Sequence, residues 1–85
     1  MTRPVRELRN LGIETERMLA EVDIPDEEHL RAVGAVAAYH RLKFRFGRRV
    51  TLVALYALEG ALTGEDWRHL GAETKDRLRR AARRD

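Results

Sequence analysis

The central run of the chain, residues 52–62, is apolar on almost every side and constrains the fold more than any other feature. It reads Leu-Val-Ala-Leu-Tyr-Ala-Leu-Glu-Gly-Ala-Leu, so only Glu59 carries a charge. A helix with this pattern has no solvent face and must be covered by neighbours on most sides. The alanine content and the length of the run favour a helix over a strand. The rest of the chain therefore has to supply helices that pack around it.

Six glycines and two prolines divide the other residues into segments of helical length. Asp26 and Thr51 precede two of these segments as N-caps, and Gly64 ends the central helix. The expected helices are 13–22, about 27–33, 35–46, 52–62, a short turn of helix at 65–70 and a basic last helix at about 72–84. No segment indicates a sheet. The sequence thus predicts an all-α fold, a compact bundle of about five short helices in one domain over residues 1–85.

Two of the expected helices have an apolar stripe that should face the core. In the first helix the stripe is Ile13, Met18, Leu19 and Val22, and in the third it is Ala35, Ala38, Tyr39, Leu42 and Phe46. The opposite face of the third helix carries His40, Arg41, Lys43 and Arg45. We expect Tyr39 and Tyr56 in the core with their hydroxyls at its edge. Trp67 should close the core under the last helix.

Several kinds of site are excluded by composition. The chain has no cysteine and no serine, so a disulfide, a thiolate metal site and a thiol or serine nucleophile are impossible. His29, His40 and His69 lack metal-ligand spacing, and no glycine-rich phosphate loop is present. We expect no cofactor, no small-molecule substrate and no enzymatic activity. No run is long enough to span a membrane, and the start of the chain lacks a signal peptide, so we expect a cytoplasmic location.

The charge of the chain is unevenly distributed. Residues 1–30 hold eight acids against four arginines, whereas residues 31–85 hold thirteen basic residues against six acids. Arginine outnumbers lysine fifteen to two. This preference is typical of phosphate recognition, because the guanidinium group binds oxyanions with two parallel hydrogen bonds. A GC-rich genome explains the same preference equally well.

A partial internal repeat has an offset of 22 residues. Residues 7–13 align with residues 29–35, and in both an apolar pair spaced by three is followed at once by glycine, at Gly12 and at Gly34. This arrangement is typical of a helix-hairpin-helix unit, in which backbone amides at the next helix start hold a phosphate. The plain alternative is a pair of glycines that end helices.

The sequence resembles the C-terminal domain of the TfoX family, regulators of competence and DNA transformation. The similarity extends from about Val5 to Leu78 and is most specific at residues 55–64, Leu-Tyr-Ala-Leu-Glu-Gly-Ala-Leu-Thr-Gly, followed by Trp67 and Leu70. The resemblance implies an all-α, helix-hairpin-helix-like (SAM-like) bundle with a regulatory role. In the family this domain usually follows a separate N-terminal domain, which is missing before Met1, so we expect a stand-alone member or an excised part.

The first corner departs from a phosphate-binding pattern. Asn10 occupies the place where such hairpins prefer a glycine, and Glu14 and Glu16 follow where a DNA-binding protein favours basic residues. The two carboxylates suit the helix dipole but repel phosphate. The first corner is therefore predicted to be a poor DNA clamp.

Basic residues after the second corner make it the better candidate. The nucleic-acid hypothesis uses the backbone amides of Gly34 and Ala35 together with Arg41, Lys43, Arg45, Arg48, Arg49, Arg79 and Arg80. Further basic residues of the last helix are Lys75, Arg77, Arg83 and Arg84. Such a set predicts salt-sensitive phosphate contacts without sequence preference. The alternative is a solvated face with a basic tail that repels like molecules.

A second function hypothesis is a protein-interaction or dimerisation module, recruited by a transcription factor or by a second copy, without DNA contact. The acidic first corner and the charge asymmetry support this hypothesis, because they suit contacts between opposite faces. The two hypotheses differ in where the cations lie. One continuous positive face favours DNA, whereas scattered basic residues flanked by glutamates favour protein.

Glu59 is the one acid inside the apolar helix, and a buried carboxylate needs a partner. We expect an arginine of the third helix or a neighbouring helix start to supply it. Catalysis would need a second titrating group nearby, and the spacing provides none.

Overall fold

The computed structural model describes residues 2–83 and is built from helices and short turns. The α-helices are α1 (Ile13–Ala20), α2 (Glu27–Val33), α3 (Ala35–Phe46), α4 (Leu52–Thr63) and α5 (Ala72–Arg83), and the 3-10 turns are η1 (Val5–Glu7), η2 (Gly47–Arg49) and η3 (Trp67–His69). Over residues 2–83 no strand forms, and the one β-bridge joins Pro4 to Asp26. The predicted all-α class is confirmed. The predicted end of the last helix at 84 lies outside the described residues.

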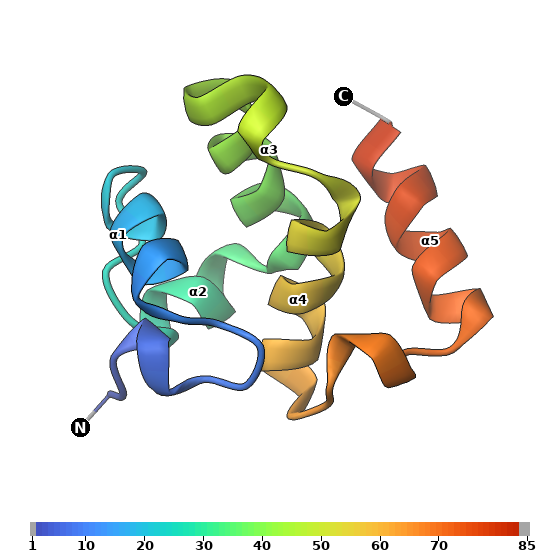
Figure 1. Ribbon diagram of the computed structural model, residues 1–85, viewed down its shortest axis with the longest axis horizontal. Helices are drawn as coiled ribbons and strands as arrows, with labels where there is room; N and C mark the ends of the chain where they lie inside the picture. Colours follow the sequence, from blue (N-terminus) through green and yellow to red (C-terminus); the bar gives the residue numbers. More distant parts are fainter. Residues whose placement is uncertain (1, 84–85) are drawn as a thin grey trace.

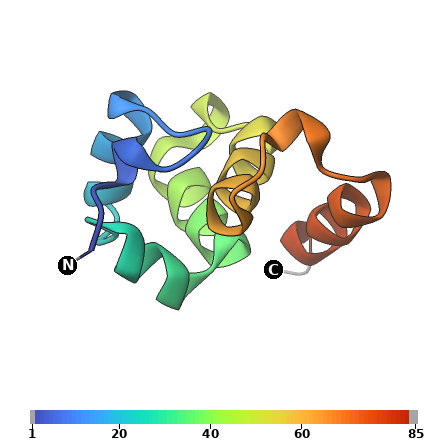
Figure 2. The ribbon, with the colours of Figure 1, turned by 90° about the horizontal axis from the view of Figure 1, so that it is seen from below.

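The central apolar run forms the middle of the molecule, as its pattern predicts. Figure 1 shows α3 and α4 side by side in the centre, with α1 and α2 at one end and α5 at the other. The view from below in Figure 2 shows the same order. In α4 the residues from Leu55 to Leu58 are buried, together with Gly60 and Ala61. Its first turn differs from the prediction, because Leu52 and Val53 are 40% and 45% exposed.

The apolar stripe of α3 is confirmed. Ala35, Ala38, Tyr39 and Leu42 are buried, and Phe46 packs partly buried against them. In α1 the predicted stripe holds only in its second half, where Leu19 is buried. Ile13 is 73% exposed, contrary to the prediction, because it is the first residue of the helix and lies beyond the elements that cover the rest of α1.

Helix α1 ends at Ala20, two residues earlier than predicted, because the chain reverses at Asp23. That residue has a φ of 66°, in the left-handed region. The amide of Ile24 donates to the carbonyl of Leu19 at 2.9 Å, and both side chains are fully buried. This pattern, with its apolar contact across the helix end, is a Schellman motif, here closed by aspartate instead of glycine. It turns the chain toward α2.

Two predicted N-caps have different outcomes. Asp26 caps α2 as expected, since its carboxylate accepts a hydrogen bond from the amide of His29 at 3.0 Å. Thr51 occupies the N-cap position of α4, but its hydroxyl makes no capping bond. Its backbone carbonyl instead accepts from the amide of Ala54 at 2.9 Å.

The two corners of the sequence repeat have different structures. Gly34, with a φ of 87°, connects α2 to α3 directly and makes a sharp helix-to-helix corner that a residue with a Cβ would strain. Gly12 also lies immediately before a helix, but the chain before it consists of η1 and a turn. A helix-hairpin-helix unit would need an α-helix before Gly12, and none forms there, because Asn10 has a φ of 74° and breaks the helical path.

Asn10 joins three distant parts of the chain. Its amide nitrogen donates to the carbonyls of Ala57, at 3.3 Å, and Glu65, at 2.8 Å, while its amide oxygen accepts from the amide of Trp67 at 3.1 Å. A Cβ at Gly60 would lie against the Asn10 nitrogen and 2.5 Å from the Glu65 carbonyl oxygen. Gly60 therefore makes the space in which this amide fits.

We predict that Gly60→Ala destabilises the protein by about 1–3 kcal/mol, because the new methyl group displaces Asn10 and the backbone of Glu65. Alanine at this helical position would otherwise favour the helix by about 1 kcal/mol. Urea unfolding followed by circular dichroism measures the difference. Gly71→Ala is the matched control, since a Cβ there meets nothing within 4 Å. Equal stability of the two variants would contradict the prediction.

We also predict that Asn10→Asp lowers the free energy of unfolding by about 1–3 kcal/mol. Aspartate tolerates the left-handed backbone and keeps the acceptor for the Trp67 amide, but it replaces the donor with an oxygen that faces two carbonyls. The same unfolding experiment tests this. A loss no greater than the loss in Asn10→Gly, which merely removes the side chain, would contradict the proposed carbonyl repulsion.

Candidate interaction surface

The predicted cation cluster of α3 is largely engaged within the protein. The guanidinium of Arg41 donates to the carbonyl of Val22 at 3.0 Å, and the ammonium of Lys43 donates to the carbonyl of Val50 at 2.7 Å. These two side chains point toward different neighbouring turns. They hold α3 in place and do not form one shared phosphate-binding face.

The acidic α1 and the basic end of α3 compensate each other. Arg45 pairs with Glu21 at 2.9 Å, and Arg49 of η2 pairs with Glu14 at 3.4 Å. Both arginine side chains remain more than half exposed, at 56% and 65%, so each pair contributes only about 0–1 kcal/mol. The charge asymmetry along the sequence is thus largely cancelled where these segments meet in space.

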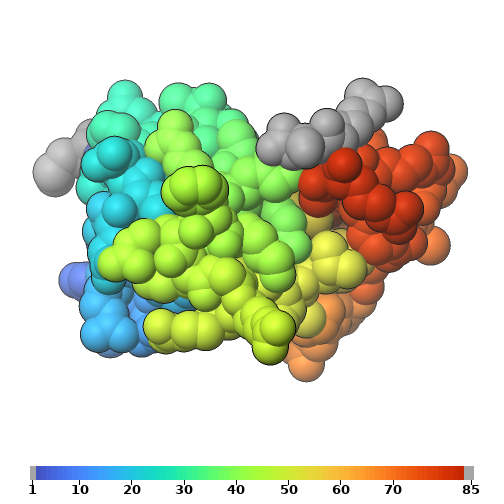
Figure 3. All heavy atoms as spheres, turned by 90° about the horizontal axis from the view of Figure 1, so that it is seen from above, coloured from blue at the N-terminus to red at the C-terminus, as the bar shows by residue number. Residues whose placement is uncertain are grey.

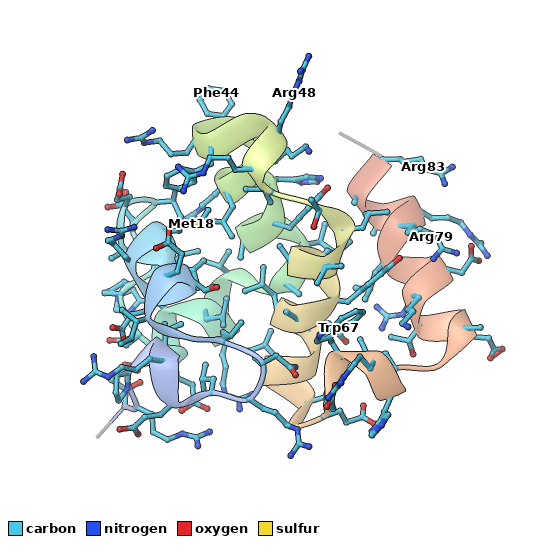
Figure 4. The ribbon with its side chains drawn as sticks, viewed as in Figure 1. Met18, Phe44, Arg48, Trp67, Arg79 and Arg83 are labelled. Atoms are coloured by element: carbon cyan, nitrogen blue, oxygen red, sulfur yellow. The ribbon has the colours of Figure 1, made fainter. Side chains whose placement is uncertain are left out.

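The predicted phosphate-binding residues lie at opposite ends of α3. Gly34 and Ala35 stand at its start, and Ala35 is only 5% exposed. Arg45, Arg48 and Arg49 stand at or beyond its last turn, about 18 Å away for a helix of this length. The structure therefore does not bring the corner amides together with the main group of cations. Arg48 points away from the protein body (Figure 4) and makes no hydrogen bond or ion pair within residues 2–83.

The cations of α5 are used mainly to attach this helix to α4. Arg79 donates to the hydroxyl of Tyr56 at 2.9 Å, and the Lys75 ammonium lies 5.5 Å and 5.7 Å from the ring centres of Tyr56 and Trp67. The two rings are stacked, with centroids 6.4 Å apart. Trp67 packs partly buried beside α5, and Tyr56 has its hydroxyl at the edge of the core, as predicted.

Two other arginines of α5 form ion pairs with carboxylates. Arg77 pairs with Glu59 at 3.4 Å, so the carboxylate of α4 finds its partner on α5 and not on α3 as expected. The prediction named the wrong helix as the source of this partner, because the sequence pattern does not show which element covers this side of α4. Arg80 pairs with Asp76, which lies one turn earlier in α5. Arg83 extends from the end of the helix, and Arg84 lies outside the described residues.

The sequence reasoning missed Phe44. This side chain is 94% exposed, the highest value for a large apolar residue among residues 2–83, and it points outward from the end of α3 (Figure 4). The signal was present in the sequence, because Phe44 lies two positions from both Leu42 and Phe46 and so falls on the opposite side of the helix from the buried stripe. Figure 3 shows this end of the molecule, where α3 and η2 lie between α1 and α5.

Beside Phe44 lies an open groove of about 790 Å³ between α2 and α3. Its lining consists of Val22, Asp23, His29, Ala32, Val33, His40, Arg41, Phe44 and Arg45. The ring of His40 also contacts the carbonyl of Ala82 at 2.8 Å, which holds the C-terminal end of α5 against α3.

In the part of the chain that the structure describes, no group of three His, Cys, Asp or Glu side chains could hold a metal ion.

His29, at the edge of this groove, is coupled to the cap of α2. Its Nδ1 lies 2.7 Å from the Asp26 carboxylate. This side-chain hydrogen bond raises the pKa of His29 above its ordinary 6.5 and lowers the pKa of Asp26 below its ordinary 3.8. The contact places the charge of His29, at the edge of the groove, beside the carboxylate that caps α2.

The pair predicts a pH-dependent contribution to stability. The raised pKa of His29 gives stabilisation that is complete below about pH 6.5 and lost as the pH rises through the folded value. The lowered pKa of Asp26 gives stabilisation that is present above about pH 3.8 and lost as the pH falls through its folded value. His29→Gln should therefore lower the melting temperature more at about pH 5.5 than at about pH 8.5. In an Asp26→Asn background this difference between the two pH values should disappear, and its persistence would contradict the pairing.

These features define a small helical module whose distinctive chemistry lies on its surface. Residues 1–82 match the family described as the TfoX C-terminal domain. The chain belongs to this family, and the resemblance drawn from the sequence is confirmed. Among residues 2–83, no helix is both long enough and apolar enough for a membrane span.

One curated relative is the DNA transformation protein TfoX1 of Aliivibrio fischeri, 29% identical over 76 residues. The match covers 89% of this chain and 36% of that relative, so the chain spans little more than a third of its length.

Two solved structures from Listeria monocytogenes have the same fold. One, in a triclinic crystal form, is of an uncharacterized protein, with a TM-score of 0.84 over 89% of this chain and 85% of the solved chain. The other, in a tetragonal form, is of a protein of unknown function, with a TM-score of 0.83 over 89% and 93% of the two chains. Both are 33% identical to this chain. They are similar across most of the fold, and their descriptions assign no function.

Proposed function

We propose that this chain is a non-enzymatic regulatory module of a DNA-transformation system that acts by holding a protein partner. Membership of the TfoX C-terminal family and similarity to a DNA transformation protein support the biological setting. Because the chain spans only 36% of that relative, carrying the setting over to this chain is itself part of the proposal.

The distribution of charge is the observation that favours a protein over DNA as the partner. Basic residues alternate with carboxylates on the surface and form ion pairs with them. These pairs include Arg3–Glu27, Arg6–Glu16, Arg17–Glu14, Arg31–Glu27, Arg45–Glu21, Arg49–Glu14, Arg68–Asp66, Arg77–Glu59 and Arg80–Asp76. Affinity for a duplex depends on cations that neutralise phosphates and release counterions. In each of these pairs the carboxylate repels a phosphate that would replace it. Scattered, compensated cations therefore support a protein-binding role.

Association with DNA is the second candidate, favoured by one observation. Arg48 and Arg83 extend from the end of the molecule where α3 and α5 terminate, and neither forms an ion pair within residues 2–83 (Figure 4). Together with the other exposed arginines of that end, they offer a smaller basic surface than the one the sequence predicted. Gly34 and Ala35 are not part of it.

The salt dependence of DNA binding separates the two candidates. If phosphate contacts are limited to Arg48 and Arg83, we predict weak binding of a labelled duplex, with a slope of about −2 in a plot of log affinity against log salt, because each neutralised phosphate contributes about −0.9. Fluorescence anisotropy at roughly 50–200 mM salt measures this slope. Tight binding with a slope near −5, abolished in Arg48→Gln/Arg83→Gln, would establish the DNA role in place of the protein role.

The protein role has its own test in cells of the source organism. A photoreactive phenylalanine analogue at Phe44 should give a cross-linked product that contains protein and survives nuclease treatment, because that side chain is 94% exposed. The same analogue at Ile13, 73% exposed on α1, is the matched control for exposure. Nuclease-sensitive products alone, or equal products at both positions, would contradict a protein-binding face around Phe44.

A further inference from the structure

Helix α5 contributes less to the core than the other parts of the chain do. Among residues 2–83, eighteen apolar residues are buried, and Leu78 is the only one of them in α5. Helices α1 and α2 also contribute one buried residue each, but the segments around them add Val5, Leu8, Leu11 and Ile24. Burial of a single leucine therefore supplies most of the apolar attachment of α5.

No backbone-to-backbone hydrogen bond joins α5 to another element in the part of the chain that the structure describes. Helix α2, in contrast, has such a bond to the N-terminal segment, from the amide of Glu27 to the carbonyl of Arg3 at 3.0 Å. Figures 1 and 2 show α5 at one end of the molecule, beside α3 and α4. The link into α5 passes through Gly71, where a Cβ would meet nothing within 4 Å. Side chains therefore hold α5 in place.

Polar side chains make most of this attachment. Arg79 donates to the hydroxyl of Tyr56 at 2.9 Å, and the ammonium of Lys75 lies 5.5 Å from the centre of the same ring. Arg77 pairs with Glu59, but its side chain is 63% exposed, so this pair adds little. When such contacts break at the surface, water can satisfy the separated groups, and the cost of breaking them is small.

We propose that Leu78 and the contact between Arg79 and Tyr56 hold α5 closed, and that α5 opens as a unit about Gly71 while α1 to α4 stay folded. Helix α5 spans 12 described residues, and an isolated helix of that length is marginal in water, so it unfolds when it detaches. Opening uncovers the stacked rings of Tyr56 and Trp67. A ligand that prefers the open form shifts the population toward it, which makes the attachment of α5 a point of regulation.

A thiol introduced into one helix reports the opening of that helix, because the chain has no cysteine of its own. Four matched variants replace a fully buried leucine in α1, α2, α4 or α5, and they are Leu19→Cys, Leu30→Cys, Leu55→Cys and Leu78→Cys. We expect the thiol in Leu78→Cys to react with an aromatic disulfide reagent at least about tenfold faster than the other three. Its rate should hardly change up to about 1 M urea, because opening of α5 exposes little surface.

The other three rates should rise steeply with urea, because each of those thiols becomes accessible only when more of the protein unfolds. Circular dichroism shows whether each variant keeps its helices. Equal rates in the four variants, or a faster reaction in Leu19→Cys or Leu30→Cys, would overturn the inference.

Hydrogen exchange of the unmodified protein gives a second readout that does not depend on how Leu78→Cys folds. Amides in the middle of α5, residues 76–80, should exchange through an opening with little dependence on urea. Amides in the middle of α4 should exchange only through global unfolding, with a steep dependence. One common urea dependence for the two helices would overturn the inference.

A matched pair of variants tests the polar contact. Tyr56→Phe removes the hydroxyl that accepts from Arg79. Tyr39→Phe changes a tyrosine of α3 that is equally exposed, at 8%, and that has no hydrogen bond to α5 within residues 2–83. By hydrogen exchange, α5 should open about two- to tenfold more often in Tyr56→Phe and as often as before in Tyr39→Phe. No change in Tyr56→Phe, or the same change in both variants, would overturn the proposed closure of α5.

Discussion

The contact between Asn10 and Gly60 is the constraint on which the rest of the structure depends. One amide group joins the N-terminal turn to α4 and to the loop that leads into η3. It fits only because α4 has no Cβ at position 60. Two of the three bonds satisfy the Glu65 carbonyl and the Trp67 amide, which lie in the loop after α4 and have no helical partner. The amide thereby fixes where Trp67, and with it α5, meets the central helix.

The same fold converts a charged sequence into a surface of small compensated pairs. Acids of α1 meet cations from α3 and η2, and Glu59 of α4 meets Arg77 of α5. Each exposed pair adds little to stability. Their larger effect is on recognition, because paired charges leave few cations to attract a polyanion. What remains distinctive is the ring of Phe44 next to an apolar hollow with Arg41 at its rim.

The secondary structure was largely predictable because it depends on local rules. Gly34, Asp26 and the apolar stripe of α3 each act within a few residues, and each was located correctly. At the first corner the repeat does not form a helix-hairpin-helix unit, because Asn10 takes a left-handed backbone that the spacing of apolar residues and glycine does not indicate. The candidate site was predicted less well than the fold. Cations adjacent in sequence, such as Arg41 and Lys43, point to different turns once they are placed on a helix.

The sequence by itself determined that five helices form, that residues 52–62 lie at their centre and that the chain belongs to its family, since periodicity, glycine spacing and a distinctive motif are local properties. Only the tertiary structure decided which charges neutralise each other, which helix covers Glu59 and which apolar ring is left in water. Those outcomes depend on distances between segments that are far apart along the chain. Local preferences carry no information about such distances, because they arise only when the helices pack around α4.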